Sequence, residues 1–185
     1  MRRRPTCWSA IARGWTPGGK VGGAYRFNGG DNYAVSLGPI GIAGAGANTV
    51  CAWCKSVRTE KDKCLWSMGD GNGAGDNAHG PILHGASLVV SYGGLGNTIT
   101  TRVDPGTWNF VCCVYDGTTQ YLYENGGLID MERRSMHLVD HPFNIGRWKA
   151  GGAYCYHFKG LIDEVMVFDR VLSARELTQI YDLQK

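Results

Sequence analysis

The hydrophobic pattern of the chain changes its period near the C-terminus. Apolar side chains alternate on both faces of residues 161–168, which predicts a strand that is covered on both sides. Ser173 and Glu176 then have the spacing of a capping box, and Leu177, Ile180 and Tyr181 follow at helical intervals. We therefore expect one buried strand that leads into one short C-terminal helix.

The rest of the chain has the pattern of short strands separated by turns. Residues rich in Gly, Asn and Asp separate the extended segments, as they do in antiparallel hairpins. The clearest of these segments are 24–27, 33–37, 49–57, 109–115 and 120–124. With the shorter segments included there are about a dozen strands, at the spacing of roughly 8–12 residues that is typical of a β-sandwich.

The composition agrees with a single all-β domain. The 185 residues are 43% hydrophobic, which is enough to form a real core, and the 28 glycines suit many turns. The formal charge of +3 is too small to indicate a nucleic-acid partner. No apolar run approaches the roughly 20 residues of a membrane-spanning helix.

Positive charge is concentrated at the start of the chain. Six basic residues precede the first acid, Asp31, and no apolar core of a secretory signal accompanies them. We assign residues 1–20 to a basic tail or extension and residues 21–185 to the domain. The tail is compatible with an organelle transit peptide, a nucleic-acid arm or a flexible segment.

The seven cysteines stand at positions 7, 51, 54, 64, 112, 113 and 155. Cys51 and Cys54 have the spacing of a redox or zinc pair, but a strand would turn them to opposite faces. Cys112 and Cys113 diverge in the same way. We expect several of these residues to be small buried thiols, which favours an intracellular, organellar or virion setting over a disulfide framework.

The order of the predicted segments resembles the laminin G-like, concanavalin A-like lectin/glucanase superfamily over about residues 22–182. The matching stretches are 24–33 (AYRFNGGDNY), 49–55 (TVCAWCK), 108–117 (WNFVCCVYDG), 120–126 (QYLYENG), 143–147 (FNIGR), 158–165 (FKGLIDEV) and 170–173 (RVLS). The resemblance implies a jelly-roll sandwich of two antiparallel sheets, one concave and one convex, with a short C-terminal helix.

The resemblance also implies a structural calcium ion. Domains of this type often hold Ca²⁺ between an Asp on the last strand and oxygens of the first hairpin. Asp163 matches the strand position, and Asn28 and Asp31 match the hairpin, so these three residues are the predicted ligands. In the alternative, Asp163 accepts hydrogen bonds from the backbone N–H groups of a turn.

No pair of acids has the pattern of a glycosidase. Retaining enzymes need two carboxylates about 5–5.5 Å apart, and in this superfamily they lie on one strand of the concave sheet. Asp163 and Glu164 are adjacent and should point to opposite faces, while Asp130 and Glu132 precede two arginines and look solvated. We therefore expect a protein without catalytic activity.

A binding module for carbohydrate is the preferred function. Sugar sites combine aromatic faces with a few polar groups. Trp148 and Arg147 lie beside a Gly-rich loop and Tyr92 precedes two glycines, so these three are the candidate ligand-binding residues. One alternative is a structural subunit of a larger assembly with a protein partner. A second alternative is a glycoside hydrolase whose acids come together only in the fold.

Overall fold

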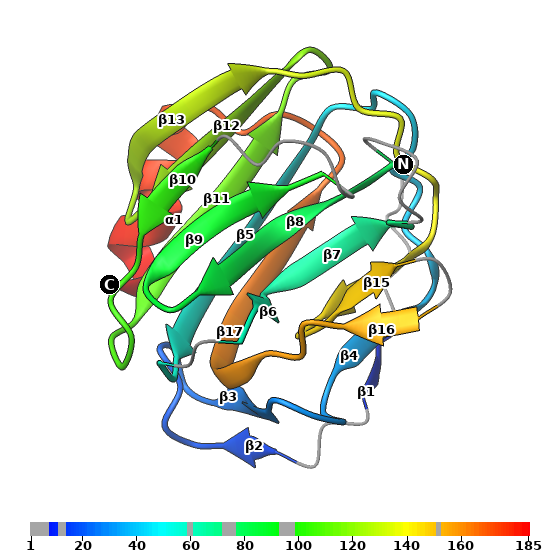
Figure 1. Cartoon of the computed structure of the whole chain (residues 1–185). Helices are drawn as coiled ribbons and strands as arrows, with labels where there is room; N and C mark the ends of the chain where they lie inside the picture. Colours follow the sequence, from blue (N-terminus) through cyan, green and yellow to red (C-terminus); the bar gives the residue numbers. More distant parts are fainter. Residues whose placement is uncertain (1–7, 11–13, 59–60, 72–76, 93–98, 151–152) are drawn as a thin grey trace.

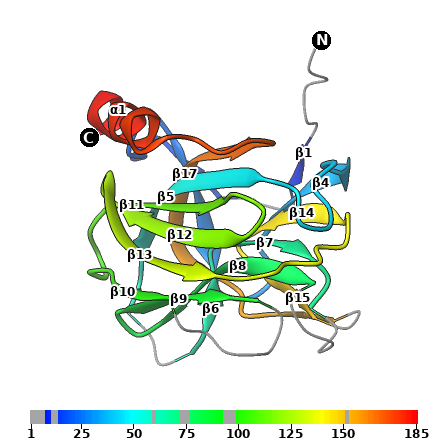
Figure 2. The same ribbon diagram turned by 90° about the horizontal axis from the view of Figure 1, so that it is seen from above.

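The computed structural model describes residues 8–10, 14–58, 61–71, 77–92, 99–150 and 153–185. Within them the chain forms two antiparallel sheets, a small separate hairpin and one helix (Figure 1). The predicted all-β jelly-roll fold with a C-terminal helix is confirmed. Viewed from above, the two sheets form separate layers, and the helix lies outside one of them (Figure 2).

The sheet next to the helix has seven strands in the described residues. Their order is β13-β12-β11-β5-β17-β3-β2. The strands are β2 (Trp15–Thr16), β3 (Ala24–Asn28), β5 (Asn48–Ser56), β11 (Asn109–Tyr115), β12 (Thr119–Glu124), β13 (Gly127–Arg133) and β17 (Lys159–Phe168). The closing strand β17 therefore lies between β5 and β3, as expected for a strand that is apolar on both faces.

The second sheet has the order β1-β4-β14-β7-β8-β9-β10, with β6 paired to β8 beside this path. Its strands are β1 (Trp8–Ala10), β4 (Ala34–Pro39), β6 (Lys63–Cys64), β7 (Trp66–Gly69), β8 (Ala78–His84), β9 (Ser87–Ser91), β10 (Thr100–Arg102) and β14 (Pro142–Ile145). The hairpin of β15 (Trp148–Ala150) and β16 (Ala153–Cys155) lies next to β7.

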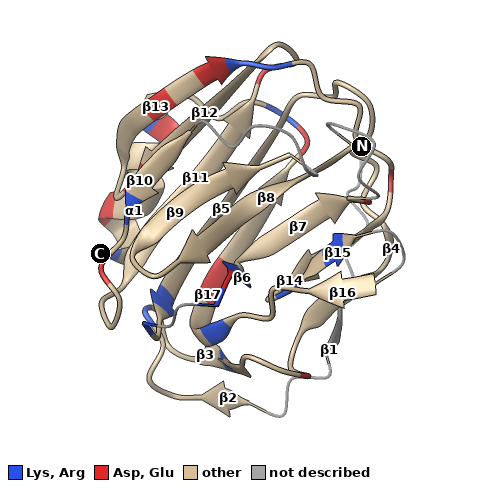
Figure 3. Cartoon of the chain, in the orientation of Figure 1, with Lys and Arg blue, Asp and Glu red and all other residues tan. Residues whose placement is uncertain are grey.

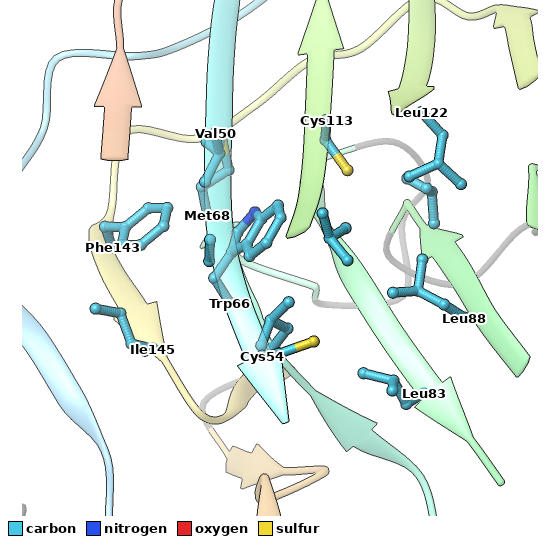
Figure 4. Packing of buried hydrophobic residues seen from close by; sticks show 14 of the residues in the cluster. Val50, Cys54, Trp66, Met68, Leu83, Leu88, Cys113, Leu122, Phe143 and Ile145 are labelled. Carbon is cyan, nitrogen blue, oxygen red and sulfur yellow. The ribbon is translucent and has the colours of Figure 1, made fainter. Parts of the chain in front are cut away.

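The core fills the space between the two sheets. Val50 and Cys54 on β5 face Trp66 and Met68 on β7, and all four are buried (Figure 4). Burying a large apolar side chain contributes roughly 1.5–3 kcal/mol. This layer of side chains is therefore the main source of stability.

The helix α1 (Ala174–Gln184) covers the outer face of the first sheet. It begins with the predicted capping box: the Ser173 side chain accepts from the Glu176 N–H, and the Glu176 carboxylate accepts from the Ser173 N–H at 2.8 Å. Leu177 packs into a second apolar cluster with Trp53. The Trp53 Nε1–H also donates to Gln184 Oε1 at 2.8 Å.

Part of the predicted N-terminal tail or extension is ordered in strands, and the boundary at residue 20 stays a prediction. Residues 8–10 form β1 on the edge of one sheet, and residues 15–16 form β2 on the edge of the other. Residues 1–7 and 11–13, which carry the first arginines, lie outside the described residues.

The cysteine prediction is partly wrong as well. Cys51 and Cys112 form a disulfide, because β5 and β11 pair in a register that places them directly opposite each other. Cys112 and Cys113 do diverge, and Cys113 is a buried thiol of the core, as is Cys54. The hydrophobic pattern fixes which face each cysteine occupies, whereas the disulfide depends on the pairing of two strands that are distant in the sequence.

Candidate functional site

Asp163 closes the chain on itself rather than presenting a free carboxylate. Its Oδ2 atom accepts hydrogen bonds from the N–H groups of Lys20 and Val21, at 2.8 and 3.0 Å. Its Oδ1 atom accepts from the N–H of Glu164 at 2.9 Å. The structure therefore shows the second of the two arrangements expected for this residue, in which backbone N–H groups satisfy the carboxylate.

Asn28 and Asp31 satisfy each other within the first hairpin. Asn28 Nδ2 donates to Asp31 Oδ1 at 2.7 Å, and Asn28 Oδ1 accepts from the N–H of Gly30 at 2.9 Å. The hydrogen bond from Asn28 is the main cause that lowers the pKa of Asp31. These contacts form a local turn network of the Asx type.

The three predicted calcium ligands do not converge. Asn28 pairs with Lys159 in the register of β3 and β17, so it lies four residues, or roughly 13 Å, along the strand from Asp163. Among the residues that the structure describes, no group of three or more His, Cys, Asp and Glu side chains is arranged to hold a metal. The expected ligand set does not fit, and calcium binding stays a prediction.

Tyr92 and Trp148 are buried, and their assignment as surface ligand-binding residues is wrong. Tyr92 is 0% exposed and packs in the core, with the Arg134 guanidinium 4.2 Å from its ring centroid. Trp148 is 3% exposed and packs with Cys64 in a small cluster beside β15. A nearby Gly permits this packing, because a Cβ on Gly71 would come 2.7 Å from Trp148 Nε1.

Arg147 lies in a stack with two tyrosines that sequence reasoning missed. Its guanidinium carbon is 3.3 Å from the ring centroid of Tyr33 and 3.5 Å from that of Tyr154. The two rings are nearly parallel, at 8°. Arg147 Nε also donates to Asn144 Oδ1 at 2.9 Å, and burial lowers the pKa of Arg147. We call Tyr33, Arg147 and Tyr154 the tyrosine–arginine stack.

The stack holds Tyr154 in place while leaving much of its ring accessible. Arg147 covers one face of the ring, yet Tyr154 remains 44% exposed. Two residues further along, Tyr156 is 41% exposed and has a positive φ of 52°. A non-glycine residue with positive φ is uncommon, and it marks a sharp change of direction before β17. The segment thus presents two tyrosine rings on a fixed backbone.

A pocket of about 790 Å³ lies next to this segment. We call it the basic pocket; its lining residues are Asn28, Gly29, Lys61, Asp62, Lys63, Tyr156, His157 and Lys159. Figure 3 shows Lys and Arg in blue at β6 and at the start of β17, which carry two of these lysines. His157 connects the pocket to the stack, because the charge of Arg147 adds to burial in lowering the pKa of His157.

Lys63 is the most unusual residue of the basic pocket. It is 1% exposed, and its ammonium donates to the backbone carbonyl of Val57. Burial lowers the pKa of Lys63, and the positive charge of Lys159 lowers it further, while Cys54 acts in the opposite direction. Within the described residues it forms no ion pair with a carboxylate.

A second cleft of about 300 Å³ is lined mainly by apolar residues, several of them on β3 and β17. Trp15 and Tyr25, which are opposite each other on β2 and β3, are exposed at its rim. Phe27 and Ile162 belong to its floor. Few polar groups are available, since Asp163 is already hydrogen-bonded to backbone. We call this feature the Trp15 cleft.

The two acids of β17, Asp163 and Glu164, do not point to opposite faces of the strand as the sequence predicts. A bulge between Asp163 and Met166, with Glu164 at a φ of 48°, interrupts the alternation of the strand. Both acids therefore line the Trp15 cleft, and the expectation that they point to opposite faces is wrong. Burial and the neighbouring Asp163 raise the pKa of Glu164, whose Oε2 accepts from Gln184 Nε2 at 3.2 Å.

The two-layered antiparallel architecture is that of a jelly-roll sandwich. A laminin G family model, described as the concanavalin A-like lectin/glucanases superfamily, matches residues 28–178. The chain belongs to this superfamily, as its resemblance in sequence predicts. No curated protein is similar enough in sequence to count as a relative.

Several solved structures share the fold at low sequence identity. The botulinum neurotoxin serotype G binding domain has a TM-score of 0.73 at 12% identity, over 97% of this chain and 47% of its own. The binding domain of Paraclostridial Mosquitocidal Protein 1 has a TM-score of 0.72 at 15% identity, over 96% of this chain and 47% of its own. The chain thus spans about half the length of these toxin domains.

A pentraxin is similar over most of its own length. The heptameric SAP-like pentraxin from Limulus polyphemus has a TM-score of 0.64 at 18% identity, over 84% of this chain and 80% of its own. At such identities the likeness extends to the fold alone. In the described residues no helix is both long enough and apolar enough to cross a membrane.

Proposed function

We propose that this protein is a non-catalytic carbohydrate-binding module and that the basic pocket, together with Tyr154 and Tyr156, is its binding site. One observation carries the proposal: two accessible tyrosine rings lie beside a pocket of about 790 Å³ whose lining includes Asn, Lys and His side chains. Aromatic faces bind the apolar faces of sugar rings, and Asn, Lys and His side chains bind hydroxyl groups.

The site is preorganised for binding. The ring of Tyr154 is already packed on Arg147, so a ligand would not have to immobilise it. The named neighbours support the same class of function, because two of the three are binding domains of toxins. Their ligands belong to those proteins and are not carried over.

The absence of catalysis is proposed on the state of the carboxylates. Asp163 receives three backbone hydrogen bonds, and Glu164 is hydrogen-bonded to α1. A retaining glycosidase needs one carboxylate free to attack the sugar. Asp130 and Glu132 lie on the edge strand β13, away from both cavities.

The experiment is affinity electrophoresis on a panel of polysaccharides, followed by isothermal titration calorimetry with oligosaccharides of the best one. We expect Tyr154→Ala and Tyr156→Ala each to weaken binding about tenfold, since each removes one stacking face. Tyr25→Ala is the matched control, because Tyr25 is 46% exposed but lines the other cleft.

Two results would contradict this proposal. A correctly folded protein that binds nothing across the panel would remove the carbohydrate function. A loss of binding in Tyr25→Ala, with Tyr154→Ala and Tyr156→Ala unchanged, would move the site to the Trp15 cleft.

A second candidate function is that of an assembly subunit, and the edge strand β13 favours it. Leu128, Ile129 and Met131 are all exposed on this strand, which ends the seven-stranded sheet. An exposed edge with apolar side chains can pair with another chain. Light scattering with size-exclusion chromatography tests this candidate: a monomer at all concentrations, in the presence of its native extract as well, would exclude it.

A further inference from the structure

Resting on the proposed function, we infer that the basic pocket selects saccharides that carry a sulfate or phosphate ester. The inference begins with Lys63. A buried ammonium group is costly unless a negative charge compensates it, and a carbonyl oxygen does so only in part. Lys63 is 1% exposed and has the carbonyl of Val57 as its hydrogen-bond acceptor.

The other charged residues of the pocket also favour the binding of an anion. Lys159 is close enough to Lys63 to disfavour its charge, and Lys61 also lines the pocket. Among the lining residues that the structure describes, the one acid is Asp62, whose Oδ1 is 2.7 Å from His84 Nδ1. Lys63 and Lys159 therefore share a lining in which the described acid already has another partner.

The residue types indicate which anion the pocket takes. Lysines act as point charges and commonly bind the tetrahedral oxygens of phosphate, whereas planar carboxylates are matched by the fork of an arginine. The lining residues in the described part of the chain include no arginine, and Arg147 in the adjacent stack is held between Tyr33 and Tyr154 and bonded to Asn144. A sulfate or phosphate group with several oxygens can contact Lys63 and Lys159 together.

The position of the pocket connects the anion to the sugar. Tyr156 is both an accessible aromatic residue and part of the pocket lining, next to His157. A sugar ring stacked on Tyr156 would therefore place its substituents beside the lysines. The specificity of the site would come from the ester group and its general affinity from the tyrosine rings.

The test compares dextran octasaccharides with sulfated dextran octasaccharides by calorimetry at low salt. We expect the sulfated ligand to bind at least about tenfold more tightly, because it neutralises the lysines. Lys159→Gln and Lys63→Met should each weaken the sulfated ligand about fivefold or more and leave the neutral one within about twofold. Lys185→Gln, at the end of α1, is the control for general charge.

Lys159→Gln keeps the test decisive if Lys63→Met does not fold, since Lys159 is an exposed residue. Chemical shifts of the pocket residues are then compared for glucose 6-sulfate, glucose 6-phosphate, glucose and inorganic phosphate. A larger change in chemical shift with one of the two esters shows whether the pocket prefers a sulfate or a phosphate group. If inorganic phosphate changes the chemical shifts as much as the sugar esters do, the pocket does not recognise an ester on a sugar, and the inference is contradicted.

The outcomes separate this inference from the proposed function. Equal affinity for neutral and sulfated ligands, with no effect of the lysine variants, would overturn the inference and leave carbohydrate binding intact. An equal loss in Lys185→Gln and Lys159→Gln would show attraction to general charge and would also overturn it. If neither the neutral nor the sulfated ligand binds, the proposed function itself is overturned.

Discussion

The buried histidine of β8 should make the stability of the protein depend on pH. His79 is fully buried between the sheets, with its ring 5.8 Å from that of Tyr92. Among the described residues neither of its ring nitrogens has a hydrogen-bond partner of good geometry. Burial lowers the pKa of His79 from 6.5 to about 4, and the side chain of Gln120 offsets only part of this effect.

The magnitude follows from the difference between the folded and unfolded chains. The unfolded chain binds the proton below pH 6.5, whereas the folded chain resists it down to about pH 4. Neutral His79 therefore makes its full contribution to the free energy of unfolding above pH 6.5, and this contribution is lost as the pH falls toward 4. With about 1.4 kcal/mol per pKa unit, the loss between pH 7 and pH 5 is about 2 kcal/mol, and about 3 kcal/mol in full.

The assay is urea denaturation of the wild type and of His79→Leu at pH 7 and pH 5. We expect the difference in unfolding free energy between the two pH values to shrink by about 2 kcal/mol in the variant. His84→Gln, a histidine at the exposed end of the same strand, is the control and should retain the full difference. His79→Gln serves if the leucine variant does not fold.

An unchanged pH dependence in a folded His79→Leu would refute this reasoning. It would mean that His79 is protonated as readily in the folded chain as in the unfolded one. The cause would then have to be water or a rearranged Gln120 that satisfies the ring.

Three further changes test other contacts. Replacing both Cys51 and Cys112 with Ala should lower the unfolding free energy by up to about 4 kcal/mol, since the disulfide closes a loop with a sequence separation of 61; thermal denaturation measures the loss, and an unchanged melting temperature would contradict it. Asp163→Asn should cost about 1–3 kcal/mol, because an amide cannot accept all three backbone hydrogen bonds; urea denaturation checks this, and a cost near zero would show that the loop has other acceptors. Ser173→Ala should cost about 1 kcal/mol through the lost cap of α1, whereas Ser173→Asp should not, with unfolding again as the measurement.

The fold could be predicted because its signals are local. Alternation over residues 161–168 identified the central strand β17, and the spacing of Ser173 and Glu176 located the start of α1. Turn residues divided the other strands. The order of the strands followed from the resemblance to a known superfamily rather than from the pattern itself.

The site was harder to predict because it depends on contacts between distant segments. The rings of Tyr33 and Tyr154 stack on opposite sides of the Arg147 guanidinium, and no spacing in the sequence indicates this arrangement. Trp148 was wrongly placed at the surface because a glycine can mark either an open loop or close packing against a ring. Lys63, directly before an apolar run, was a visible signal of an unusual lysine.

The contact between Asp163 and the N-terminal loop also has a consequence for how the chain folds during synthesis. Its hydrogen bonds span 143 and 142 residues, and β17 fills the gap between β3 and β5. A ribosome releases Lys20, Val21, β3 and β5 well before it releases β17. The edges of β3 and β5 that pair with β17 therefore stay unpaired until β17 is synthesised, and nascent chains are open to aggregation in that interval. We expect the sandwich to become complete only after β17 has left the ribosome.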